Sequence, residues 1–205
     1  MQITLFAGDV CDVRAEALCT STNPRLSLMM GTGAAVRGRG GPRILRQCEA
    51  IVEAELSRTG KRGLPPGSAH GTTAGDLPAK LVIHCVASDG SHRSSPDIVR
   101  SCTRSALAAA DAADCATIAM PVFGSGHAGV PFKEALVAMA SVLRDVVTEV
   151  RRVFIVVFDR ERAAEAVRVI ESVLPSTEID LEYGPAAEEE SIGMWSADWG
   201  EHYGR

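Results

Sequence analysis

Aromatic residues are scarce in this chain of 205 residues, at 4% of the total, and long apolar runs are absent. Its apolar segments are far shorter than the roughly 20 residues needed to cross a bilayer, so no membrane span is expected. The opening segment, Met1–Ala7, lacks the basic start and small-residue cleavage site of a signal peptide. These absences predict a cytoplasmic protein without a membrane partner.

The chain also lacks the cysteine and histidine spacings that are typical of metal sites and redox dithiols. The six cysteines include no closely spaced pair of the kind found in zinc knuckles or redox dithiols, and most lie among apolar residues. Buried free thiols are therefore expected. The five histidines show no spacing like that of a zinc protease, so neither a metal site nor a cofactor is predicted.

An excess of positive charge is absent too. The net charge of -5 argues against general nucleic-acid binding, which requires a basic footprint for phosphate backbones. A compact phosphorylated ligand is still allowed, because backbone amides and helix N-termini can hold it without Lys or Arg.

What the chain does contain is an alternation of β-branched runs and amphipathic stretches, which is typical of an α/β layer fold. The length suits one domain with a tail. Strands are predicted at Ile3–Phe6, Ala17–Thr20, Ala69–Thr73, Leu81–Val86, Thr117–Met120, Val153–Phe158 and Ile179–Tyr183. Helices are predicted at Ala34–Arg37, Pro42–Arg58, Pro96–Ala113, Phe132–Val147 and Arg160–Val173.

The last segment of the chain differs in character from the rest. We place the domain at residues 1–184 and an acidic tail at residues 185–205, which lacks an apolar period and holds both tryptophans. Two interpretations of the tail stay open: it folds back with Trp195 and Trp199 as anchors, or it stays mobile as an interaction segment.

Two segments rich in glycine, Met29–Gly41 and Gly124–Gly129, are predicted to be loops that connect a strand to a helix. In that position each can direct unpaired amides at an anion, at the strand carboxyl ends where ligands dock in α/β folds. The alternative is that both are only tight connections.

Four motifs in order resemble the macrodomain family over roughly Met1–Leu174. Gly8-Asp9-Val10 resembles the family's Gly-Asp-Ile segment, in which the carboxylate accepts a hydrogen bond from the adenine amino group and a neighbouring amide meets the ring. A carboxylate suits that role because it only accepts when ionised. Asp9 would otherwise be a turn or helix-cap residue.

The second motif, Cys19–Leu26, resembles Val-Asn-Ala-Ala-Asn-x-x-Leu. Asn23 falls on the second asparagine, which implies contact with the distal ribose, although it would also suit a loop ahead of Pro24. Thr20 replaces the first asparagine. Met29 and Met30 stand where many members carry glycine. The stretch that follows resembles the diphosphate loop and helix start, which implies ligand contacts from Gly31, Thr32, Gly33 and Ala34.

The third motif is Val82-Ile83-His84, which resembles the family's Val-Ile-His strand. We expect His84 to satisfy buried groups rather than to touch ligand. The fourth runs from Ile118 to Gly129 and resembles the loop that closes over the second phosphate and distal ribose. The implied ligand contacts are Gly124, Ser125, Gly126, His127, Ala128 and Gly129. His127 could pair with phosphate, orient a water or point into solvent.

Phe158, at the exit of the last core strand, resembles the aromatic that packs against adenine, the alternative being ordinary core packing. Hydrolases of the family pair the distal-ribose asparagine with an aspartate ten positions later, which here is Gly33. No carboxylate lies between Met29 and Gly41, so this loop offers no general acid or base. Asn23 and His127 are the candidate catalytic residues.

The resemblance implies a three-layer α/β/α sandwich with a central mixed β-sheet. It also implies binding of ADP-ribose or of an ADP-ribosylated macromolecule. ADP-ribosyl hydrolysis or deacetylation of O-acetyl-ADP-ribose is a further expectation. Two alternatives stay open: a protein-interaction module whose pocket is lost, with methionines filling the cleft, and, ranked last, another kind of nucleotide enzyme. The oligomeric state is left open.

Overall fold

The computed structural model describes residues 1–185, in which seven strands form one sheet in the order β3-β4-β2-β5-β6-β1-β7. Neighbouring strands pair in parallel except β3, which is antiparallel to β4, so the expected mixed sheet is confirmed. The strands are β1 (Gln2–Ala7), β2 (Ala17–Thr22), β3 (Ala69–Thr73), β4 (Leu81–Val86), β5 (Thr117–Pro121), β6 (Arg152–Val157) and β7 (Ile179–Tyr183).

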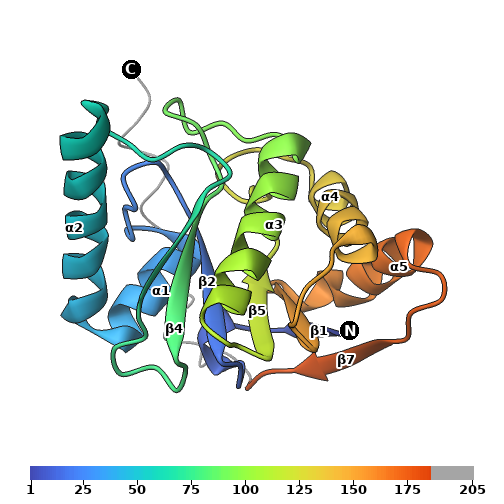
Figure 1. Ribbon diagram of the computed structural model, residues 1–205. Coiled ribbons are helices and arrows are strands. Elements are labelled where there is room, and N and C mark those ends of the chain that lie inside the picture. The colour runs from blue at the N-terminus through green and yellow to red at the C-terminus, as the bar shows by residue number, and fades with distance from the viewer. Residues whose placement is uncertain (186–205) are drawn as a thin grey trace, which may run out of the picture.

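Helices cover both faces of the sheet, with α1 and α2 on one side and α3, α4 and α5 on the other (Figure 1). This is the three-layer sandwich that was expected. The helices are α1 (Gly31–Gly40), α2 (Pro42–Thr59), α3 (Pro96–Ala112), α4 (Phe132–Asp145) and α5 (Ala163–Val173), and two 3-10 turns lie at Val10–Asp12 and Arg160–Arg162.

The central strands are buried on both faces, which is why they read as continuous apolar runs. In β6, Val153 and Ile155 pack into the core beneath α3–α5, whereas Phe154 and Val156 pack into the core beneath α1 and α2. The six cysteines are all free and buried, as expected. Within residues 1–185, every helix is too short or too polar to span a bilayer.

The first glycine-rich segment is a correction to the sequence analysis. We expected a loop through Met29–Gly41 with a helix only at Ala34–Arg37, but α1 occupies Gly31–Gly40. Gly33 and Gly40 permit close packing, whereas Gly31 and Gly41, at the two ends of the helix, have φ values of +52° and +80°. A Cβ at Gly40 would lie 2.4 Å from Ile44 Cδ1, and one at Gly33 would lie 3.2 Å from Leu28 Cα. Tertiary packing therefore outweighs the weak helix propensity of glycine.

Other boundaries differ by a few residues. Helix α4 ends at Asp145 rather than Val147, because Val146 is extended. The helix expected from Arg160 begins at Ala163, after a 3-10 turn that the Asp159 side chain caps. Apart from Pro185, the predicted tail, with Trp195 and Trp199, lies outside the described residues.

Candidate functional site

The predicted site residues follow the carboxyl ends of parallel strands and therefore meet at one edge of the sheet. Asp9 follows β1, Asn23 follows β2, Gly124 follows β5 and Phe158 follows β6. Strands β2 and β5 are neighbours, as are β6 and β1. The sequence predicted this edge from the order of its elements.

Asp9 serves as the cap of the first 3-10 turn, and its Oδ1 accepts a hydrogen bond from the Cys11 amide at 2.8 Å. The cap role that we considered is thus present. Gly8 fixes the exit from β1, because its amide donates to the Val157 carbonyl at 2.9 Å. Val10 is fully buried, side chain and backbone together.

Asn23 builds the loop after β2 with its side-chain oxygen. Its Oδ1 accepts from the amides of Arg25, at 3.0 Å, and Ser27, at 3.3 Å. Among the residues that the structure describes, the side-chain nitrogen Nδ2 has no hydrogen-bond acceptor. The Asn23 side chain can therefore shape the loop through its oxygen and donate to a ligand through its nitrogen.

The N-terminus of α1 presents a row of amides. The first intrahelical donor is Ala34, whose amide bonds to the Met30 carbonyl at 3.2 Å, so the amide of Ala34 is already used. The amides of Gly31, Thr32 and Gly33 precede it and have no helical acceptor. The Thr32 hydroxyl accepts from the Ser21 amide at 3.2 Å, which ties this end of α1 to the end of β2.

The second glycine-rich segment is a loop, as predicted. Gly124 and Gly129 have φ values of +70° and +79°, which favour glycine. The loop is closed by the Val130 amide, which donates to the Gly124 carbonyl at 3.0 Å. Within the described part of the chain, the amides of four loop residues donate to no protein group: Gly124 and the consecutive residues Gly126, His127 and Ala128.

Phe158 lies one residue beyond β6 and is 73% exposed, which excludes the alternative of ordinary core packing. The side chains of Met29 and Met30 are 62% and 40% exposed, so neither is packed into a closed cleft. Met29 Sδ instead accepts a hydrogen bond from Arg37 Nη1 at 3.1 Å.

His84 is a structural residue, as expected. It is fully buried, with Nδ1 3.1 Å from the Thr20 hydroxyl and Nε2 2.8 Å from the Thr72 hydroxyl. Burial, with a smaller contribution from His70, lowers the pKa of His84 to about 4. Thr20, which stands in place of the family's first asparagine, is thus occupied in holding this imidazole.

His92 is the residue that sequence analysis missed. It lies in the loop between β4 and α3, and its ring centre is 6.4 Å from that of His127. The only signal in the sequence was its position, eight residues after the Val-Ile-His motif. Nothing in the chain order indicates that this loop reaches the one after β5.

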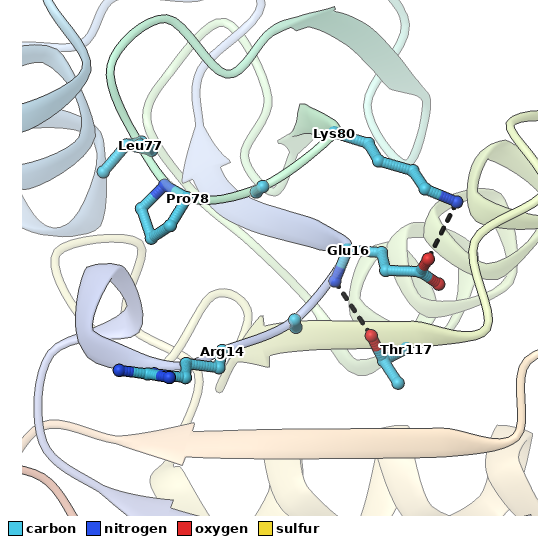
Figure 2. Close-up of a pocket in the computed structure, with 8 residues that line it drawn as sticks. Arg14, Glu16, Leu77, Pro78, Lys80 and Thr117 are labelled. Atoms are coloured by element: carbon cyan, nitrogen blue, oxygen red, sulfur yellow. Dashed lines mark hydrogen bonds and ion pairs between the residues drawn. The ribbon is translucent and has the colours of Figure 1, made fainter.

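A hollow of about 440 Å³ lies elsewhere, at the amino ends of the strands. Figure 2 shows Glu16 between Lys80 and Thr117: its carboxylate pairs with Lys80 at 2.8 Å, and its amide donates to the Thr117 hydroxyl at 2.8 Å. The hydrogen bond from Lys80 lowers the pKa of Glu16. These contacts join the starts of β2, β4 and β5, which indicates a structural role at the edge opposite the predicted site.

Metal ligands are not gathered at either edge. Across residues 1–185, no group of three or more His, Cys, Asp or Glu side chains is placed to hold a metal ion. The fold and the site together define a three-layer α/β/α domain with an edge suited to anions, because free amides at a helix N-terminus and in a loop attract negative charge.

Comparison with known proteins gives the family. The model of the macro domain family matches residues 19–139, and the chain belongs to this family. It is 38% identical to a macro domain-containing protein of Streptomyces nogalater over 77% of this chain and 85% of that protein. It is 29% identical to the O-acetyl-ADP-ribose deacetylase of Klebsiella pneumoniae over 84% of this chain and 98% of that enzyme.

A solved structure shows the same fold. The macrodomain of Oceanobacillus iheyensis, in a glycine-to-valine mutant with ADPR, superposes with a TM-score of 0.76 at 20% identity. The match covers 84% of this chain and 93% of that one. The macrodomain fold expected from the four motifs is therefore confirmed.

Proposed function

We propose that this protein binds ADP-ribose at the carboxyl edge of its sheet. The observation that carries the proposal is the pair of amide rows at the ends of the adjacent strands β2 and β5. One row is Gly31, Thr32 and Gly33, and the other is Gly126, His127 and Ala128. Two such rows can hold a diphosphate without a basic side chain.

The remaining residues suit the two ends of the same ligand. Asp9 and the exposed ring of Phe158 follow the neighbouring strands β1 and β6, where they can bind the amino group and the face of adenine. Within residues 1–185 the Asn23 Nδ2 group donates to no protein atom, so it can donate to the distal ribose. Membership of the macro domain family supports this arrangement, as does the related fold that binds ADPR.

A second candidate function is hydrolysis of an acyl ester of ADP-ribose. It is favoured by the likeness to the Klebsiella deacetylase along nearly the whole of that enzyme. The loop aspartate of the family's hydrolases is replaced by Gly33, where a Cβ would lie 3.2 Å from Leu28 Cα. Any hydrolysis would therefore need acid–base groups from another part of the edge.

The exposure of Met29 and Met30 argues against the protein-interaction alternative, since a lost pocket would require these side chains to fill the cleft. Their position at the start of α1 leaves them at the rim, from which they can contact whatever carries the ADP-ribose group.

Calorimetric titration with ADP-ribose tests the proposal. Wild-type protein is expected to bind one molecule, and Phe158→Ala should weaken binding about fivefold, as expected for loss of roughly 1 kcal/mol of stacking. Val147→Ala is the control, because Val147 is also exposed but lies between α4 and the start of β6, at the amino edge of the sheet. It should bind like wild type. No heat at near-millimolar ligand would refute the proposed function.

A further inference from the structure

Two loops meet at the distal-ribose end of the proposed cleft: residues 87–95, after β4, and residues 124–129, after β5. The Ser94 amide donates to the Ala128 carbonyl at 3.0 Å, which joins them. The Ser94 hydroxyl is buried beside Gly124 and has no hydrogen-bond partner among the described residues. A backbone hydrogen bond therefore joins the two loops, and the Ser94 hydroxyl beside it is available to a further partner.

The first of these loops holds His92 in a defined position. Asp89 Oδ1 accepts from the amides of Ser91, at 2.8 Å, and Arg93, at 2.9 Å, while the His92 amide donates to the Asp89 carbonyl at 3.1 Å. His92 has a φ of +60°, which is uncommon for a residue other than glycine. Residues held in such conformations cluster at functional sites.

The two imidazoles at the junction are spaced to act on two oxygens carried by one carbon. The ring centres of His92 and His127 are 6.4 Å apart, with the planes at 72°. An oxygen hydrogen-bonded to a ring nitrogen lies about 4 Å from the ring centre, so two rings at this separation can each reach one of two oxygens on the same carbon. Both side chains are exposed to solvent, so water and ligand can reach them.

We propose that His92 and His127 form the acid–base pair for hydrolysis of a carboxylic ester on the distal ribose, an inference that rests on ADP-ribose binding as the proposed function. One imidazole takes a proton from a water whose oxygen attacks the carbonyl carbon. The bond from that carbon to the ribose oxygen then breaks, and the other imidazole gives a proton to the departing oxygen. Ester and water become a carboxylic acid and a ribose hydroxyl.

This assignment explains how the reaction proceeds without the usual carboxylate. The segment Met29–Gly41 contains no acid, and Gly33 packs too closely against Leu28 for a side chain to enter without a shift. The pair lies on the loops that follow β4 and β5, the strands on either side of β2. The two imidazoles would contact the ester on the ribose from the side of residues 124–129, whose amides hold the phosphate.

The test is steady-state hydrolysis of O-acetyl-ADP-ribose, with ADP-ribose binding measured on the same proteins. His92→Asn keeps a residue that tolerates positive φ but cannot act as an acid or base, and His127→Gln makes the matching change in the other loop. Each should lower kcat by about 100-fold or more. KM and the Kd for ADP-ribose should change less than about threefold, because the amide rows are intact.

The double variant should be little worse than either single variant, since residues that act together are not additive. Ser91→Ala, an exposed change in the same loop, is the control and should keep wild-type kcat. Binding without turnover by wild type, or full kcat in His92→Asn, would overturn the histidine pair and leave the proposed function standing. Loss of ADP-ribose binding by wild type would overturn both.

Discussion

At the scale of single residues, His84 shows how burial sets the chemistry of a side chain. The imidazole bridges Thr20 on β2 and Thr72 on β3, and burial lowers its pKa to about 4 from an ordinary value of 6.5. Protonation therefore favours the unfolded chain, in which the ring is solvated. Stability that is present above pH 6.5 is lost as the pH falls through the window from 6.5 to about 4.

This shift predicts a difference between wild type and His84→Gln in urea unfolding. Between pH 7 and 4.5, wild type should lose about 2 to 3 kcal/mol more than the variant, because only wild type carries this titrating ring. The variant is expected to be less stable at pH 7, so the comparison is of the two pH slopes. Equal slopes would show that His84 does not titrate as its burial requires.

The sequence was informative about residues whose role depends on their own segment. His84 was expected to be structural because it falls within a buried strand, and its two threonine partners bear this out. For Asp9 and Asn23 the sequence allowed a local role and a ligand role, and both make the local hydrogen bonds. His92 could not be found, because its proximity to His127 depends on how two loops meet in space.

At the scale of elements, the two glycine-rich segments have opposite outcomes. Gly31–Gly40 is helical, since Gly33 and Gly40 allow close packing, whereas Gly124 and Gly129 shape a true loop with positive φ. Glycine content alone does not distinguish a helix from a loop, because glycine occurs both where segments pack closely and where the backbone is left-handed. In both cases the amide rows still lie at the strand carboxyl ends.

The loop after β5 gives a prediction about stability. A Cβ at Gly124 would lie 2.7 Å from the Ser94 hydroxyl oxygen at a φ of +70°, whereas one at Gly126 would meet nothing within 4 Å. Gly124→Ala should lower the free energy of unfolding by about 1 to 3 kcal/mol. Gly126→Ala should change it by less than about 0.5 kcal/mol.

Urea unfolding monitored by circular dichroism measures both variants. A similar stability for the two proteins would mean that the junction with the 87–95 loop is not packed as described.

At the scale of the whole molecule, the sheet, which is parallel except for β3, separates two kinds of site. At the amino edge, an ion pair and a hydrogen bond join Glu16 to Lys80 and Thr117 beside a hollow of about 440 Å³. The amide rows lie at the carboxyl edge. The order of strands and helices predicted an α/β layer fold and the carboxyl edge, and the family resemblance implied the three layers. The strand order across the sheet, and hence which loops are neighbours, depends on packing between distant segments.

The central claim is that ADP-ribose binds across the ends of β2 and β5. Its most direct test is amide chemical-shift mapping of the labelled protein during titration with ADP-ribose. The account predicts the largest shifts at Gly31, Thr32, Gly33, Gly126, His127 and Ala128, with the amides of Glu16, Lys80 and Thr117 unchanged. Shifts gathered at the amino edge, or no shifts in either amide row at saturating ligand, would contradict it.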